Sequence, residues 1–358
     1  MEREKIVTEF FKHGHLLTEE AIRIIEEKGL EEFLDKKLPF VIDTKDLQQP
    51  YRIIKNLTYK KTEITKDDFI RFYNSKYEKM KAIITDRVQK GFVSLNKLDS
   101  MRNEVHVIGI VKDIKEKDDK KIVELEDTTT SVPVIFDDVE DLELDDVVAI
   151  RAISGGKVLF GKKIIYPDMP LRNPTTGTGR GCFISDLKLD EAPQKDAERF
   201  FEWFSQQDIP NLFVSGKIGD KELFDKYVGR YCYIKTVFVI ADDTDYPALS
   251  DTFNSNRIVS LSNPAMIEVG GLKVLMLQKA DMKMLKKRYL GKSHAILDED
   301  YLVVDEIPDI VHSGCSNEPY VTNYKSATLV NSGSLLGDFR PIVIDFATRD
   351  VEKITLMK

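Results

Sequence analysis

Residues 182–190 hold the side chains whose types and spacing most directly suggest chemistry. Three apolar residues, 182–184, read as a buried strand that stops at Ser185 and Asp186. A carboxylate at the end of a core strand is where many sheet-based hydrolases hold a metal ion. Two residues later stands Lys188, whose ammonium group repels cations and cannot ligate them. The stretch therefore leaves two alternatives, a metal site or the remains of one.

The composition is that of a globular chain with no general affinity for nucleic acid. Its 358 residues are 42% hydrophobic and 32% charged, which favours two or three domains. With a formal net charge of −8, any nucleic-acid contact must come from a local basic patch or from a partner. The three cysteines lie far apart, as in a reduced cytosolic protein, so we expect a cytoplasmic location. We expect neither a signal peptide nor a membrane span.

The hydrophobic period divides the chain into three regions. Residues 1–62 form a predicted N-terminal helical domain and linker, with a helix between Thr18 and Gly29 and an irregular stretch over 37–62. Residues 63–170 begin with a helix at Thr65, where Asp68 completes a capping box, and continue as five short strands. Five such strands predict a closed barrel of the OB type. Its loop over 137–146 is acidic, which opposes binding to phosphates and favours a protein contact.

Residues 171–358 read as a larger domain of strands and helices. The predicted strands are 182–184, 211–214, 233–240, 272–277, 310–312, 327–331 and 342–346, and the predicted helices are about 195–207 and 280–289. The second helix carries Lys283, Lys286, Lys287 and Arg288, the strongest basic patch in the chain. A solvated face is slightly favoured for this patch over a contact with nucleic acid.

The order of these regions and several short motifs resemble the small subunit of the archaeal family D DNA polymerase. The resemblance covers nearly the whole chain, and its clearest segments are 74–79, 108–111, 125–127, 261–265, 271–275, 308–312 and 330–333. It implies an α+β multidomain fold in which residues 171–358 form a calcineurin-like phosphoesterase domain, a two-sheet sandwich flanked by helices. In that family this domain carries a two-metal 3′–5′ exonuclease, and the subunit binds the large polymerase subunit.

The family's first metal motifs fall on positions that have lost most of their ligands. Its Asp-x-His motif falls on 186–188, where Asp186 remains and Lys188 replaces the histidine. Its Gly-Asp motif, which supplies the carboxylate that bridges the two metals, falls on Gly216 and Lys217.

The later motifs are altered in the same way. Gly-Asn-His-Asp falls on 242–245, which puts Asp243 at the asparagine and Thr244 at the histidine. The remaining histidines of the family fall on Gln278, Cys315 and Asn317. The nearby His312 lies on a predicted core strand, where a hydrogen-bonded structural role is favoured.

A divalent ion in this site would have to face Lys188 and Lys217. Two like unit charges 4 Å apart cost about 4 kcal/mol at an effective dielectric of about 20. We therefore expect no catalytic residue, no metal and no cofactor; any residual ligation would come from Asp186 and Asp243. An ion pair between one of these carboxylates and Lys188 or Lys217 is expected instead.

The sequence thus predicts a non-catalytic accessory subunit of a replicative DNA polymerase. It would bind the large catalytic subunit and reach DNA through the complex. One alternative is a metal-dependent 3′–5′ exonuclease or phosphodiesterase with an altered two-metal site. Another is a stand-alone DNA-binding protein that uses the basic patch of residues 283–288.

Overall fold

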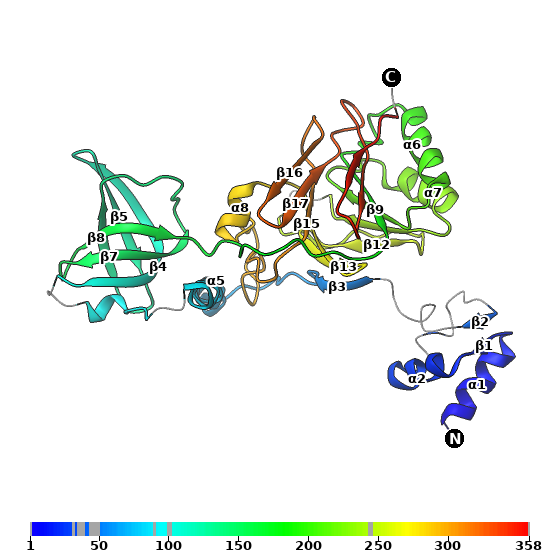
Figure 1. The fold of residues 1–358 in the computed structure, drawn as a ribbon, viewed down its shortest axis with the longest axis horizontal. Helices are drawn as coiled ribbons and strands as arrows, with labels where there is room; N and C mark the ends of the chain where they lie inside the picture. Colours follow the sequence, from blue (N-terminus) through cyan, green and yellow to red (C-terminus); the bar gives the residue numbers. More distant parts are fainter. Residues whose placement is uncertain are drawn as a thin grey trace.

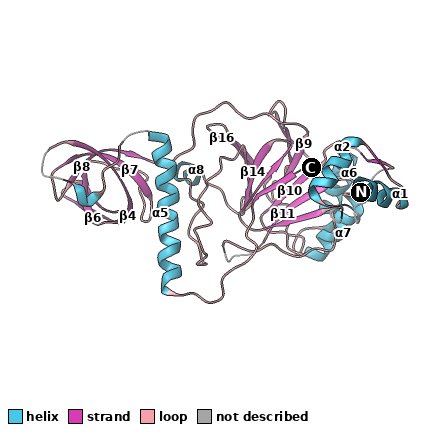
Figure 2. Cartoon of the chain, turned by 90° about the horizontal axis from the view of Figure 1, so that it is seen from below, coloured by secondary structure: helices cyan, strands magenta, loops and turns pink. Residues whose placement is uncertain are grey.

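The computed structural model describes residues 2–30, 33, 40–42, 51–88, 91–98, 102–242 and 246–356. Figure 1 shows three parts: a small N-terminal helical module, a body of two sheets, and a barrel at the opposite end. The long helix α5 (Lys66–Val88) runs between the barrel and the body (Figure 2). The fold is of the α+β class, as predicted. No helix in these ranges is long and apolar enough to cross a membrane.

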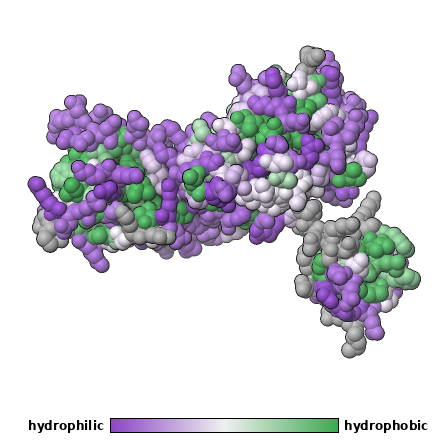
Figure 3. Space-filling view, viewed as in Figure 1, coloured by the Kyte–Doolittle hydropathy of each residue, from purple (hydrophilic) through white to green (hydrophobic). Residues whose placement is uncertain are grey.

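The N-terminal module is built around its own small core. It contains α1 (Glu2–Lys12), β1 (Leu16–Leu17), α2 (Glu19–Lys28) and β2 (Val41–Ile42), with β1 and β2 parallel. Thr18 caps α2 by accepting a hydrogen bond from the Ala21 N–H, and Gly29 ends it with φ of 94°, as predicted. Ile6, Phe10 and Ile25 belong to a buried cluster made only of module residues. Apolar side chains also remain on the module's surface (Figure 3), Phe11 and Phe40 among them.

A strand within the stretch predicted to be irregular joins the N-terminal half of the chain to the body. Residues Tyr51–Lys55 form β3, which pairs with β13 (Ala265–Val269) in an antiparallel ladder. The prediction of an irregular 37–62 is wrong at these residues; residues 43–50 lie outside the described ranges. The strand is stabilised by a partner more than 200 residues away, and the Tyr51 ring packs edge-on against Phe238 at 5.0 Å. A local sequence pattern does not disclose such a partner.

Helix α5 begins at the predicted capping box. The Thr65 N–H donates to Asp68 Oδ2 at 2.8 Å, and the Asp68 N–H donates back to Thr65 Oγ1 at 3.3 Å. Further along α5, Tyr77, Met80 and Ile84 are buried between the outer face of the barrel and the segment that follows α8. The helix therefore acts as the packing layer between the barrel and the body.

The barrel is closed and has five strands, in the order β4-β5-β6-β8-β7. Its strands are β4 (Glu104–Lys117), β5 (Lys120–Glu126), β6 (Ser131–Phe136), β7 (Val147–Ser154) and β8 (Leu159–Ile165), preceded by the short 3₁₀ helix η1 (Leu95–Lys97). The five short strands predicted for this region are therefore present, and the first is longer than expected. Alternating residues such as Val132, Val134 and Phe136 fill the interior, and a Cβ on Gly161 would lie 2.1 Å from the Phe136 ring.

The body consists of two six-stranded sheets packed face to face. Their orders are β12-β11-β10-β9-β18-β19 and β16-β17-β15-β14-β13-β3. The strands of the first sheet are β9 (Arg180–Ser185), β10 (Asn211–Ser215), β11 (Thr236–Ile240), β12 (Ile258–Leu261), β18 (Ile342–Asp345) and β19 (Val351–Lys353). Besides β3 and β13, the second sheet contains β14 (Leu272–Leu277), β15 (Ile310–Ser313), β16 (Tyr320–Tyr324) and β17 (Ala327–Asn331).

Aromatic packing holds these layers together. Between the sheets the Phe213 ring stacks on Phe183 at 4.5 Å and on Phe238 at 5.1 Å. Helices α6 (Gln194–Gln206) and α7 (Lys221–Tyr231) pack on the other face of the first sheet, with Phe200 and Phe201 in their shared core. Sequence reasoning found α6 and most of the central strands. It missed α7, β12, β13, β16 and β19.

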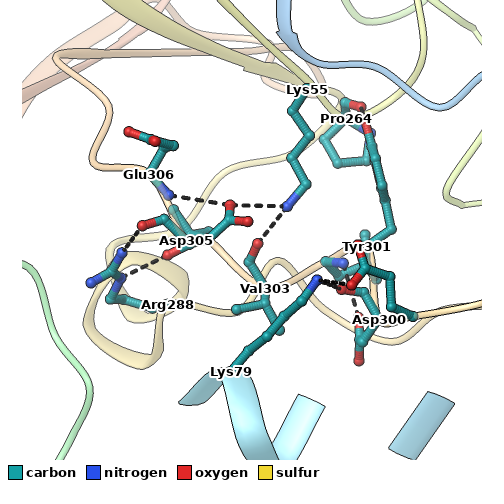
Figure 4. A network of polar contacts seen from close by, with 12 residues as sticks. Lys55, Lys79, Pro264, Arg288, Asp300, Tyr301, Val303, Asp305 and Glu306 are labelled. Carbon is teal, nitrogen blue, oxygen red and sulfur yellow. Dashed lines mark hydrogen bonds and ion pairs between the residues drawn. The ribbon is translucent and has the colours of Figure 1, made fainter. Parts of the chain in front are cut away.

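A segment of the body, residues 300–306, is held from three sides (Figure 4). Lys55 on β3 donates to the Val303 carbonyl at 2.6 Å, and Lys79 on α5 donates to the Asp300 carbonyl at 3.3 Å. Arg288, directly after α8 (Met282–Lys287), donates to the carbonyls of Val304 and Asp305. The 74–79 segment of the sequence thus has a structural role, since Lys79 fixes α5 to the body.

Candidate functional site

The ends of five strands meet at one open pocket of about 460 Å³. Strands β9, β10 and β11 are parallel neighbours in one sheet, and β14 and β15 are parallel neighbours in the other. Ligand sites in sheet proteins often lie at the carboxyl ends of such strands. The residues lining the pocket are Asp186, Lys188, Lys217, Asp242, Gln278, Cys315, Ser316 and Asn317. The motif positions selected from the sequence are therefore close together in space, except that Asp243 and Thr244 lie outside the described residues.

Asp186 is the buried carboxylate of this pocket. It is 3% exposed and has φ of 50°, and its Oδ1 accepts a hydrogen bond from the Lys217 N–H at 3.1 Å. Its Oδ2 is buried and makes no hydrogen bond of ordinary geometry with any described residue. Burial raises the pKa of Asp186, while the backbone N–H groups of Lys217, Cys315 and Ser316 and the charge of Lys188 oppose the rise.

Two glycines allow the chain to approach this carboxylate closely. Gly216 has φ of 74°, and a Cβ there would lie 2.4 Å from Asp186 Oδ1. A Cβ on Gly314 would lie 2.4 Å from the Gly216 Cα and 3.3 Å from Asp186 Oδ2. The site is thus a tightly packed backbone cradle around one carboxylate.

The Lys217 side chain points away from that cradle. Its ammonium forms ion pairs with Asp190 at 3.0 Å and Glu191 at 2.9 Å, and these contacts raise the pKa of Lys217. No ion pair joins Asp186 to Lys188 or Lys217, so the pairing expected for Asp186 is not formed. The reason is that Lys217 serves Asp186 through its backbone N–H, while its side chain reaches two carboxylates at the surface. A surface pair avoids the cost of desolvating an ammonium group.

Asp242 is a second carboxylate of the pocket, which sequence reasoning missed. Its Oδ2 accepts the Ile218 N–H at 3.1 Å, and burial raises the pKa of Asp242. The related family has a glycine at this motif position, so the comparison of motifs gave no reason to single it out. Its place two residues after β11 was the available signal, because Asp186 likewise stands at the end of a core strand, directly after β9.

At the positions where the related family has histidines, the remaining pocket residues carry neutral amide or thiol side chains. Gln278 donates its backbone N–H to Asn263 Oδ1 at 3.1 Å and accepts the Gly314 N–H on its carbonyl at 2.9 Å. Cys315 has φ of 56°, and burial raises the pKa of its thiol. Neither an amide nor a thiol of raised pKa exchanges protons near neutral pH as an imidazole does.

His312 lies inside β15 and is fully buried, away from the pocket lining. Its Nδ1 lies 3.0 Å from Ser215 Oγ, and its ring packs edge-on against Phe183. Burial lowers the pKa of His312 to about 3, so the ring is neutral at physiological pH. The predicted core role of this histidine is confirmed.

The described part of the pocket offers two carboxylates, backbone N–H donors, the ammonium of Lys188, and the ammonium of Lys217, which is already paired with Asp190 and Glu191. No group of three or more histidine, cysteine or acidic side chains able to hold a metal ion occurs in the described ranges. A two-metal centre needs several such ligands around each cation. The described side chains therefore fit that group poorly, and their nearest ammonium groups would repel it.

The three lysines of the basic patch on α8 range from exposed to nearly buried, and each pairs with a carboxylate, which the expected solvated face did not include. Lys283 and Lys286 both pair with Asp141 at 3.1 Å. Lys287 pairs with Glu143 at 2.7 Å and with Asp146 at 2.8 Å. The acidic loop of the barrel thus docks on α8 of the same chain, and each neutralises the other. This pairing removes the patch on which a stand-alone DNA-binding function would rest.

Comparison with known proteins identifies related sequences but no matching family model. The chain is 23% identical to the DNA polymerase II small subunit of Archaeoglobus fulgidus, over 79% of this chain and 73% of that protein. The corresponding values are 24%, 78% and 74% for the Methanothermobacter thermautotrophicus subunit. For the Thermoplasma acidophilum subunit they are 24%, 93% and 86%. The similarity predicted from short motifs therefore extends over most of the chain.

Solved structures show only distant likeness. A Thermotoga maritima protein aligns with a TM-score of 0.32 and 16% identity, over 50% of this chain and all of that one. Vacuolar Protein Sorting 29 from Cryptosporidium parvum aligns with a TM-score of 0.31 and 15% identity, over 50% of this chain and 96% of that one.

Proposed function

We propose that this chain, a relative of the archaeal DNA polymerase II small subunits, is a non-catalytic accessory subunit of a replicative DNA polymerase. The observation that carries the proposal is similarity to these subunits over 78% to 93% of the chain in the first three relatives. Relatives named small subunits imply a large catalytic partner. The chain would bind that partner in the cytoplasm and reach DNA through the complex.

The proposal assigns a role to each part of the chain. Residues 63–170 would be α5 with an OB-type barrel, and residues 171–358 an inactive calcineurin-like phosphoesterase domain. The closed five-stranded barrel and the face-to-face six-stranded sheets support these assignments. The N-terminal helical domain and linker were predicted as residues 1–62. Because β3 belongs to the sheet of the body, we place that boundary before Tyr51.

The non-catalytic part of the proposal rests on the chemistry of the pocket. Lys217 stands where a bridging carboxylate would be required, and Lys188 stands beside Asp186. Gln278, Cys315 and Asn317 occupy the positions of imidazoles. Asp186 and Asp242 could still ligate one cation, which is why the metal-dependent exonuclease remains the alternative to be tested.

Co-expression with the large polymerase subunit of the same organism tests the proposed function. An affinity tag on this chain should recover the large subunit through size-exclusion chromatography as a complex. Recovery of this chain alone, under conditions in which both proteins are soluble, would contradict the proposal.

A nuclease assay distinguishes the exonuclease alternative from the proposed non-catalytic function. The isolated chain should release no nucleotides from a single-stranded 3′ end with Mn²⁺. Release that disappears in the Asp186→Asn and Asp242→Asn variants would instead support an altered exonuclease.

A further inference from the structure

A second pocket, of about 450 Å³, lies where α5, the acidic loop of the barrel and α8 meet. We call it the junction pocket. Its lining contains the side chains of Tyr73, Lys76, Leu144, Met284, Tyr289 and Ile296. The three parts that form it come from distant stretches of the sequence, and α5 runs directly between the barrel and the body (Figure 2).

The walls of the junction pocket are held in place by contacts that are already formed. Lys287, 10% exposed, pairs with Asp146, 11% exposed, and so fixes the barrel loop against α8. The Tyr289 hydroxyl donates to Asp300 at 2.9 Å. A preformed cavity of this kind binds a ligand without a large ordering cost.

Lys76 gives the pocket a positive charge that no described carboxylate pairs with directly. The residue is 6% exposed, and its ammonium lies 3.7 Å from the centre of the Tyr289 ring. It makes no hydrogen bond or ion pair with another described residue. The carboxylates of Asp145, Asp146 and Asp300 act on it only from a distance, and burial lowers the pKa of Lys76. A buried ammonium that opens into a cavity is best satisfied by a carboxylate of a ligand.

Two exposed apolar or aromatic side chains line the pocket among its charged residues. Tyr73 on α5 is 53% exposed, and Leu144 on the barrel loop is 55% exposed. These side chains come from two different elements that line the same cavity, with Ile296 also in the lining. Exposed apolar and aromatic side chains around a concave site are the usual anchors of a protein interface.

We propose that the junction pocket receives a segment of the large polymerase subunit in which a carboxylate stands beside an apolar side chain. The apolar group packs between Tyr73 and Leu144, and the carboxylate pairs with Lys76. The lining also contains four acidic residues and three further lysines, Glu143, Asp145, Asp146, Asp281, Lys283, Lys287 and Lys292. A single carboxylate need meet only Lys76, whereas the successive phosphates of a nucleic-acid strand would also face these acids, so a strand fits less well. This inference rests on the proposed function, since it names the surface through which the subunits would bind.

Binding of the purified large subunit to the full chain tests the inference. The Tyr73→Ser/Leu144→Ser double variant removes the exposed anchors, and Lys76→Met removes the charge. Each should weaken binding at least tenfold, whereas Lys76→Arg, which keeps the charge, should restore most of it. The matched control is Phe160→Ser, an exposed aromatic on the barrel that is not in the lining. It should change binding less than twofold.

The outcomes are separable. Thermal unfolding of each variant shows whether it folds, and the double variant changes only exposed side chains, so its loss of binding cannot come from the core. Equal binding by wild type, the double variant and Lys76→Met overturns the junction pocket while leaving the proposed function intact. Failure of the wild-type chain to bind overturns the proposed function and this inference with it. A change only in self-association or in binding to single-stranded DNA also overturns the inference.

Discussion

At the scale of single residues, the candidate site is a buried carboxylate that backbone N–H groups surround and no described side chain neutralises. Asp186 is therefore expected to be costly to the fold when it is ionised. Asp190 lies a few residues away and has the opposite environment, because Lys217 lowers the pKa of Asp190. These two carboxylates provide a matched pair for testing the electrostatics of the site.

The first prediction concerns the pH dependence of stability. The pKa of Asp186 is higher in the folded state than in the unfolded state. The contribution of this side chain to the unfolding free energy is therefore present in full below the unfolded-state pKa, and it is lost as pH rises through the folded-state pKa. The difference in unfolding free energy between wild type and Asp186→Asn should therefore shift in favour of the variant from about pH 4 to pH 8. Urea unfolding at several pH values measures it.

The control for this experiment is Asp190→Asn, for which the sign reverses. The folded-state pKa of Asp190 is lowered, so its contribution is present above the unfolded pKa and is lost as pH falls. The difference should then shift in favour of wild type as pH rises from about 2 to about 4, and should stay constant above about pH 4, where Asp190 is ionised in both the folded and the unfolded state. A shift of the same sign for both variants would contradict the conclusion that burial raises the pKa of Asp186.

A second prediction concerns the glycine cradle. Gly216→Ala should destabilise the protein by about 1–3 kcal/mol or more, because φ is positive and the new Cβ would overlap Asp186 Oδ1. Gly229→Ala, within α7 and with nothing near its Cβ position, should instead stabilise by about 0.5–1 kcal/mol. Chemical denaturation of both variants checks the contrast, and similar values for the two would refute the cradle.

At the scale of elements, the barrel and the body are joined by α5 and by the contact of the acidic loop with α8. Lys287 and Asp146 form the buried part of that contact, while Lys283 and Asp141 form an exposed part. Buried and exposed ion pairs differ in what their removal costs. The two lysines therefore separate the contribution of burial from that of charge alone.

We predict that Lys287→Met destabilises the protein by about 3 kcal/mol, because it leaves Asp146 buried without its cation. Lys283→Met should change the unfolding free energy by less than about 0.5 kcal/mol. Unfolding followed by tryptophan fluorescence and circular dichroism measures both. Equal effects would mean that the loop does not dock on α8 as described.

Truncation tests where the N-terminal module ends. Removal of residues 1–50 should leave the unfolding transition of the remainder nearly unchanged, because the module's cluster involves only its own residues. Removal of residues 1–62 also deletes β3 and the Lys55 contacts, and should lower the midpoint by about 5 °C or more. Equal midpoints would place the boundary after β3 instead.

Local patterns predicted the elements whose stability is local. The cap of α2 by Thr18, the capping box of α5 and the alternating strands of the barrel could all be read from neighbouring residues. Strand β3 could not, because its partner β13 lies more than 200 residues away. The same limit applies to the α8 patch: its composition predicted a solvated face, and only the tertiary structure brings the carboxylates of the barrel loop to it.

The predicted strands also indicated which residues would meet at the site. Each of the residues concerned comes directly after a core strand or one residue later: Asp186, Lys217, Gln278 and Cys315. The direction of the Lys217 side chain could not be predicted, because it depends on Asp190 and Glu191 lying within reach. Side-chain direction is set by packing that the sequence does not express locally.

At the scale of the whole molecule, the chain keeps a complete framework around a pocket with few metal ligands. The barrel, α5 and the body are joined by many specific contacts, whereas the described pocket residues include two lysines. This combination is what the proposed scaffold role requires. The proposed scaffold role therefore has to be tested in the assembled polymerase as well as in the isolated chain.

The most direct test compares two assembled complexes, one with the wild-type chain and one with an Asp186→Asn/Asp242→Asn variant. Both are assayed for nucleotide incorporation and for Mn²⁺-dependent release of nucleotides from a 3′ end. We predict that both chains assemble with the large subunit and that the two rates agree within a factor of two. Loss of 3′ release in the variant complex, with assembly and incorporation intact, would show that the pocket is catalytic and would contradict this account.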